Sequence, residues 1–212
     1  MTSGEALAAG TAALGLDLDA ATRDKLLAYL KLLEKWNRTH NLTAVREPER
    51  MLSLHLLDSL AVIPHLPDSE RLRLADVGSG GGLPGIPLAI LRPGWAVALV
   101  ESSKKKCAFL RQAVADLGLA NTEVVNERAE ALSPTQLFDV VIARALSDLA
   151  RFVAVAGHLL GPRGRLVAMK GAYPDREVAA LPASVRVLAA PRLDIPGVAG
   201  ERHLIILETR AA

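Results

Sequence analysis

The chain has 212 residues, of which 50% are hydrophobic and 23% charged, and its formal net charge at pH 7 is +2. This composition is typical of a folded globular protein and excludes a disordered, collagen-like or coiled-coil chain. The single cysteine, Cys107, excludes a disulfide framework, and the small net charge permits a nucleic-acid partner without predicting one. The sequence has neither a secretory signal pattern nor an apolar stretch of about 18 residues, so we expect a cytoplasmic protein without a membrane segment.

Residues 1–71 are predicted to form a helical N-terminal extension. From Asp19 onward leucines recur at helical spacing, and Asp19 or Thr22 can cap this helix. We expect the polar residues 37–41 to break it. A second helix is predicted to start after Pro48 and to end near Pro64.

Residues 72–212 are predicted to form a seven-stranded α/β domain. Short apolar runs alternate with amphipathic segments there, which is typical of a parallel sheet built from βαβ units. Strands are expected at 73–77, 96–101, 123–126, 139–143, 165–169, 185–189 and 203–208. Helices are expected at 85–91, 104–117, 149–160 and 175–181, with at most a short turn over 130–136. The long loop at 191–202 predicts that the last strand returns antiparallel.

The stretch after the first strand is the most informative part of the chain. Asp76, Gly78, Gly80 and Gly82 form the pattern D-x-G-x-G-x-G. Glycines permit positive φ angles and close approach of a ligand, and the following helix presents free N–H groups at its start. The pattern predicts a nucleotide-like ligand at the carboxyl edge of the sheet, with Asp76 and Gly80 among its binding residues.

The same letters also fit a dinucleotide fingerprint through Gly80, Gly82 and Gly85. In that fingerprint the first glycine directly ends the strand, whereas Gly80 follows Gly78 by two residues. An NAD(P)-dependent oxidoreductase is therefore the alternative enzyme class.

The D-x-G-x-G-x-G pattern resembles motif I of class I S-adenosylmethionine-dependent methyltransferases, whose fold is Rossmann-like and seven-stranded. Further segments narrow the resemblance: W-N-R-T-H-N-L-T at 36–43, H-L-L-D-S-L at 55–60, L-P-G-I-P at 83–87, R-A-E at 128–130 and M-K-G at 169–171. Together they resemble the RsmG family, also called glucose-inhibited division protein B. The resemblance implies a cytoplasmic enzyme that uses S-adenosylmethionine to methylate a guanine N7 in the decoding region of 16S ribosomal RNA.

The resemblance also implies cofactor contacts at Gly78, Leu83, Ala129, Glu130 and Arg144. Ala129 and Glu130 follow the third strand, where they could meet the adenine edge. The alternative for this pair is a helix start with an acid near the positive end of the helix dipole.

Two further positions have a physical argument of their own. Glu101 ends the second strand about twenty residues after the central glycine, a spacing that suits a ribose diol. Alternatively Glu101, Ser102 or Ser103 caps the next helix. Arg144 ends the fourth strand and could hold the cofactor's carboxylate or an RNA phosphate, the alternative being a surface salt bridge.

The end of the fourth strand also bears on the reaction. Methyltransferases that act on amino groups usually carry an Asn/Asp-Pro-Pro-aromatic box there, whereas this chain has Ala143-Arg144-Ala145-Leu146. Amino methylation is therefore disfavoured. Guanine N7 carries no proton, so its methylation needs alignment and charge management rather than a general base, with Arg144 and Lys170 as candidate catalytic residues.

Candidate RNA contacts are basic residues expected at the rim of the cleft: Arg38, His40, Arg46, Lys170 and Arg202 with His203. Each could instead be a solvated surface charge, and so could the run Lys104-Lys105-Lys106. The partner expected is 16S rRNA or the small ribosomal subunit. The histidines lack metal-ligand spacing, so no metal is predicted, and Cys107 is expected to be a buried structural thiol. A non-catalytic RNA-binding assembly factor that retains the fold remains a further alternative.

Overall fold

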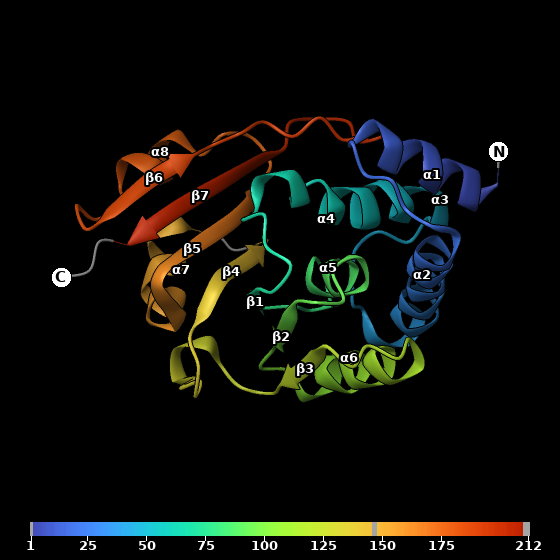
Figure 1. Cartoon of the computed structure of the whole chain (residues 1–212), viewed down its shortest axis with the longest axis horizontal. Helices are drawn as coiled ribbons and strands as arrows, with labels where there is room; N and C mark the ends of the chain where they lie inside the picture. Colours follow the sequence, from blue (N-terminus) through green and yellow to red (C-terminus); the bar gives the residue numbers. More distant parts are fainter. Residues whose placement is uncertain (1, 146–147, 210–212) are drawn as a thin grey trace.

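A computed structural model describes residues 2–145 and 148–209, and its centre is a seven-stranded sheet in the order β3-β2-β1-β4-β5-β7-β6 (Figure 1). The strands are β1 (Arg73–Val77), β2 (Ala96–Val100), β3 (Thr122–Val125), β4 (Phe138–Arg144), β5 (Leu160–Lys170), β6 (Val185–Ala189) and β7 (His203–Thr209). β1 to β5 pair in parallel, and β7 pairs antiparallel with both β5 and β6. The predicted sheet and its antiparallel last strand are confirmed.

The helices between the strands are α5 (Gly85–Leu91), α6 (Lys104–Asp116), α7 (Leu149–Ala156) and α8 (Asp175–Ala179), with 3₁₀ turns at Ala129–Ala131 and Gly157–Leu159. The predicted helix at 149–160 is too long. Its end lies at Ala156 because Leu160 already pairs with Phe138 and starts β5. β5 therefore begins earlier than the sequence predicted.

The N-terminal extension consists of α1 (Ser3–Ala13), α2 (Ala20–His40), α3 (Pro48–Met51), the π-helix η1 (Leu52–Leu57), α4 (Asp58–Leu60) and the 3₁₀ turn η2 (Ile63–His65). Asp19 caps α2 by accepting a 2.7 Å hydrogen bond from the N–H of Thr22, as predicted. The predicted break at 37–41 is wrong, because α2 continues to His40 and ends at Asn41 with φ 51°. Within the helix, Asn37 turns its side chain inward and accepts a hydrogen bond from the N–H of Thr43.

Helix α1 was not among the predicted elements. Its sequence SGEALAAGTAA is rich in small residues and shows little amphipathic pattern. The usable signal was local: Thr2 and Glu5 form a capping box.

Two hydrophobic clusters cover the two faces of the sheet. The larger one joins leucines of the extension, such as Leu33 and Leu56, to Val140 and Ile142 of β4. The other places Phe152 of α7 against Val141 and Ala143. Figure 1 shows α2 and α4 beside α5, with α1 outside them. The extension therefore packs on one face, and the division at residue 71/72 stays a prediction, because residues on both sides share one core.

Across residues 2–145 and 148–209, no helix is both long and apolar enough to span a membrane.

Candidate functional site

The glycine loop, residues 78–82, leaves β1 and turns sharply. Gly78, Gly80 and Gly82 have φ angles of 72°, 57° and 83°, a region that favours glycine. The N–H of Gly78 donates to the carbonyl of Val100 at 2.8 Å, and the hydroxyl of Tyr29 donates to the carbonyl of Gly81. The loop is thus fixed from the sheet on one side and from α2 on the other.

Asp76 lies beneath this loop and not on its surface. Its side chain is fully buried, and Oδ2 accepts a 2.9 Å hydrogen bond from the N–H of Gly85 at the start of α5. Burial raises the pKa of Asp76 to about 7. Among the described residues Oδ1 has no hydrogen-bond partner. The carboxylate of Asp76 therefore joins β1 to the start of α5.

A cavity of about 340 Å³, here called the edge cavity, opens beside the glycine loop at the carboxyl ends of β1 and β2. Four predicted cofactor residues line it together: Gly78, Glu101, Ala129 and Glu130. Gly78 is exposed, and a Cβ placed there would meet nothing within 4 Å. An open backbone beside a carboxylate fits a nucleoside with a diol, which is the shape of the adenosine part of S-adenosylmethionine.

Glu101 connects the edge cavity to the loop. Its Oε2 accepts from the N–H of Gly80 at 3.0 Å, and its Oε1 accepts from the N–H of Ser103 at 2.8 Å. The side chain of Ser103, and not that of Glu101, caps α6. The carboxylate of Glu101 is therefore oriented by two backbone donors. Of the three residues considered as the cap of α6, Ser103 is the one that caps it.

Several residues that were not predicted to contact the cofactor also line the edge cavity: Ser102, Glu127, Arg128, Ala145 and Arg151. Ala145 has a φ of 62°, a rare conformation for a residue with a Cβ, and such strain gathers at functional sites. No sequence signal indicates it, because alanine is not a residue that favours positive φ. Arg128 begins the R-A-E segment, of which only Ala129 and Glu130 were predicted to contact the cofactor.

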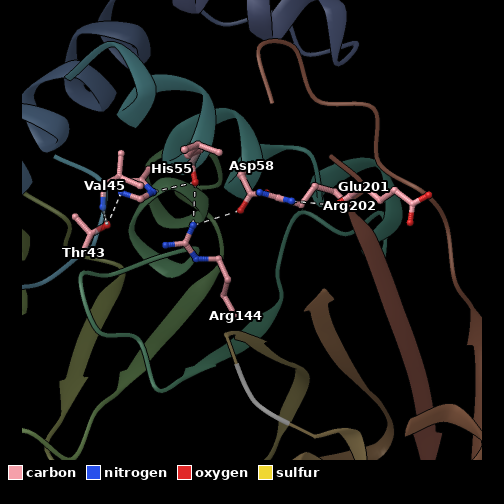
Figure 2. Close-up of polar contacts among 8 residues, drawn as sticks. Thr43, Val45, His55, Asp58, Arg144, Glu201 and Arg202 are labelled. Carbon is pink, nitrogen blue, oxygen red and sulfur yellow. Dashed lines mark hydrogen bonds and ion pairs between the residues drawn. The ribbon is translucent and has the colours of Figure 1, made fainter. Parts of the chain in front are cut away.

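Other predicted cofactor residues lie outside the lining of the edge cavity. Leu83 is buried and donates its N–H to the carbonyl of Ser79, so it shapes the loop. Arg144 lies on the opposite side of β4: its guanidinium reaches the carbonyl of Leu54 and the carboxylate of Asp58 (Figure 2). It forms an ion pair, as the alternative interpretation expected, but a half-buried one with the extension. Leu146 lies outside the described residues.

The predicted RNA contacts gather on the extension and at neighbouring strand ends. Arg38 pairs with Glu34 at 2.9 Å, and together with Arg46 they line a small cavity of about 130 Å³ at the end of α2. His40 stacks at a tilt on Trp36. Lys105 donates to the carbonyl of Thr39 at 3.4 Å, which brings the lysine run to the same region.

Lys170 and His203 lie at the ends of β5 and β7, which pair with each other there. Lys170 forms a 2.7 Å ion pair with Glu177 of α8, and only 11% of its side chain is exposed. Glu177 also accepts from the N–H of Leu149 at the start of α7. Through Glu177, Lys170 therefore links the end of β5 to α8 and to the start of α7.

Two further side chains are buried near the site. Burial lowers the pKa of His55 to about 4, so the imidazole is neutral at pH 7. Cys107 is fully buried, as predicted, and donates to the carbonyl of Glu101. In the part of the chain that the structure describes, no group of three or more His, Cys, Asp or Glu residues could hold a metal ion.

Two solved structures similar to this one are described as methyltransferases. An S-adenosylmethionine-dependent methyltransferase from Aquifex aeolicus covers 85% of this chain and 96% of its own, with a TM-score of 0.61 and 18% identity. The glycopeptide N-methyltransferase MtfA, complexed with sinefungin, covers 73% of this chain and 85% of its own, with a TM-score of 0.60 and 14% identity. These likenesses establish the class I methyltransferase fold, to which this chain adds the helices of its N-terminal extension.

Sequence comparison goes further than the fold. The protein named Ribosomal RNA small subunit methyltransferase G from Nitrosospira multiformis is 55% identical over 209 residues, which cover 95% of both chains. Its counterpart from Laribacter hongkongensis is 53% identical over 97% of this chain and 98% of that protein. The family model described as rRNA small subunit methyltransferase G matches residues 22–205. The chain therefore belongs to the rRNA small subunit methyltransferase G family.

Proposed function

We propose that this protein transfers a methyl group from S-adenosylmethionine to N7 of a guanine in 16S ribosomal RNA. The observation that carries the proposal is the edge cavity, where the exposed Gly78 and the oriented carboxylate of Glu101 lie side by side at the carboxyl edge of the sheet. Membership of a methyltransferase family supports it and speaks against the oxidoreductase alternative.

The cavity residues divide the binding of the cofactor among them. S-adenosylmethionine, when bound, supplies a methyl group on a positively charged sulfur that a lone pair can attack. Glu101 offers carboxylate oxygens to ribose hydroxyls, and its two backbone donors hold those oxygens in place. Ala129 lies buried at the cavity wall, where its backbone can meet the adenine edge, with Glu130 exposed beside it.

Methylation of guanine N7 requires no general acid or base from the protein. Guanine N7 has an in-plane lone pair and no proton to lose, so orientation and charge are what the protein must control. The attacked methyl carries positive charge and so does the methylated ring. Arg144 and Lys170 lie outside the lining of the edge cavity, and each is paired with a carboxylate, Asp58 and Glu177, which limits the positive charge that they add around it.

We further propose that the substrate is an RNA-containing particle, the small ribosomal subunit or its precursor, in the cytoplasm. Arg38, Arg46 and Lys105 gather around the end of α2, and Arg202 lies half-buried before β7. Several phosphates can be contacted by such a spread of guanidinium and ammonium groups, which positions RNA without reading its sequence.

Methyl transfer from labelled S-adenosylmethionine to small subunits that lack the modification tests the proposal. The label should map to a guanine N7 and should be lost in Gly78→Asp, whose carboxylate would enter the edge cavity. Gly118→Asp is the matched control, because Gly118 has a φ of 62° and open space at its Cβ but lies after α6. Label on another base would overturn the N7 assignment. Cofactor binding with no transfer to any particle would favour the assembly-factor alternative.

A further inference from the structure

A cluster of three charged side chains, Asp58, Arg144 and Arg202, joins segments that are far apart in the chain (Figure 2). Asp58 Oδ2 lies 3.3 Å from Nη1 of Arg144, and Asp58 Oδ1 lies 3.2 Å from Nε of Arg202. The two partners follow Asp58 by 86 and 144 residues. One carboxylate thus holds the end of β4 and the segment before β7 against the start of α4. We call these three residues the arginine cluster.

Burial within the arginine cluster is uneven. Only 7% of the Asp58 side chain is exposed, against 23% for Arg144 and 29% for Arg202. The carboxylate therefore lies below the two guanidinium groups, which reach the surface. A buried carboxylate that accepts from two arginines fixes both of them more firmly than an exposed ion pair would.

Both arginines have N–H groups that are not used in the contacts described above. Arg144 uses Nη1 for Asp58 and for the carbonyl of Leu54 at 3.0 Å. Arg202 uses Nε for Asp58 and Nη1 for the carbonyl of Glu201 at 2.8 Å. A guanidinium has five N–H donors, and within residues 2–145 and 148–209 the Nη2 group of each arginine has no acceptor. The cluster also carries a net charge of +1, since one carboxylate faces two cations.

The arginine cluster lies across the sheet from the edge cavity. Side chains alternate along β4: Val141 and Ala143 pack in the hydrophobic core beneath α7, whereas Val140 and Ile142 face the extension. Arg144 continues the second series and reaches Asp58. The edge cavity is lined by Val77 and Ala129, which belong to the α7 side. Free donors of the cluster therefore point to a ligand other than the nucleoside in that cavity.

Hydrogen bonds extend from the arginine cluster to the segment that carries Arg46. The carbonyl of Leu54 accepts from Arg144 and also from Nδ1 of His55 at 2.9 Å. Nε2 of His55 pairs with the hydroxyl of Thr43 at 2.9 Å, and that oxygen accepts from the N–H of Val45 at 3.1 Å. Figure 2 shows this chain as one continuous set of contacts. The π-helix η1, a form often found at functional sites, carries both Leu54 and His55.

We propose that Asp58 is a positioning residue for the RNA: it holds Arg144 and Arg202 side by side so that their free N–H groups grip a phosphate of the target strand. This inference rests on the proposed function, since it assigns a role in binding the same substrate. Two guanidinium groups fixed by one buried acceptor present a preorganised site for the two non-bridging oxygens of a phosphodiester, which lowers the entropy cost of binding.

The test compares Asp58→Asn with the unaltered protein. Asparagine keeps the size of the side chain but offers one acceptor oxygen, so at least one arginine is released. We expect the KM for small subunits lacking the modification to rise at least about tenfold, with the dissociation constant of S-adenosylmethionine changed less than about twofold. Glu208→Gln, which breaks the exposed pair with Arg186, is the control and should change neither value.

A double variant tells whether Asp58 acts through the arginines. If it does, the double variant Asp58→Asn/Arg202→Lys should bind the particle as tightly as whichever single variant has the lower affinity. Both substitutions remove the same contact, so their losses should not add. Additive losses would contradict the proposal, as would a weakened cofactor affinity with an unchanged KM, which would assign the cluster to the cofactor's carboxylate. If Asp58→Asn does not fold, Arg202→Lys alone must reproduce the rise in KM.

Particle binding is measured separately by filter retention without turnover. Should the protein retain particles but methylate none, the proposed function fails while the effect of Asp58→Asn on retention still decides this inference. Retention equal to that of the unaltered protein would overturn the positioning role.

Discussion

Around the glycine loop, most hydrogen bonds have a backbone N–H as donor, as from Gly78 to the carbonyl of Val100 and from Gly85 to the carboxylate of Asp76. Around Asp58, the contacts are made by charged side chains from segments 86 and 144 residues apart. The first region tolerates no added bulk on its inner side, whereas the second depends on the identity of a few side chains. The loop is thus a rigid scaffold for a small ligand, and the arginine cluster is an assembled surface.

Gly85→Ala should break the scaffold with the largest effect. A Cβ at Gly85 would lie 2.3 Å from Cδ2 of Leu99 and 2.7 Å from Oδ2 of Asp76. Relieving this overlap means moving α5 away from the sheet, so we expect a loss of about 1–3 kcal/mol or more in the free energy of unfolding. Urea unfolding monitored by circular dichroism measures it. Gly4→Ala is the control, because a Cβ in that turn of α1 is free of overlap, and a loss there as large as at Gly85 would refute the argument.

The two regions also differed in how far the sequence predicted them. The glycine loop is contiguous, so its spacing predicted both its place and its neighbour Glu101. Asp58 lies in the H-L-L-D-S-L segment, yet its partners Arg144 and Arg202 become neighbours only in the folded sheet. The positive φ of Ala145 and the helix α1 were not predicted for a related reason, because alanine gives little hydrophobic periodicity and no turn signal.

Tyr29→Phe sharpens the comparison by testing how much the extension supports the loop. The substitution leaves the carbonyl of Gly81 without its buried donor. We expect a loss of about 1–3 kcal/mol in stability and a weaker affinity for S-adenosylmethionine. Thermal unfolding and calorimetric titration measure the two effects. Tyr173→Phe, at an exposed tyrosine, should leave both unchanged; equal effects at the two tyrosines would mean that the extension does not brace the loop.

The pH dependence of stability should reveal His55. Because its pKa is about 4 in the folded protein and near 6.5 when unfolded, the unfolded chain binds the proton more tightly between these values. The contribution of His55 is complete above pH 6.5 and is lost as the pH falls toward 4. We expect the drop in Tm between pH 7 and pH 5 to be smaller, by a few degrees, in His55→Asn. Identical drops would show that His55 titrates normally, and an NMR titration of the imidazole provides the direct check.

Arg38→Ala should have the smallest effect on the stability of the fold and still a measurable effect on RNA binding. Its pair with Glu34 is exposed, with 75% of the arginine side chain accessible, so we expect a stability change below about 0.5 kcal/mol. If Arg38 contacts a phosphate, the slope of log affinity against log salt should fall by about 1. Binding of small subunits measured over a salt series gives the slope. Arg186→Ala, at the exposed pair on β6, is the control. An unchanged slope in Arg38→Ala would make Arg38 a solvated surface charge and shift the phosphate contacts toward Arg46 and the arginine cluster.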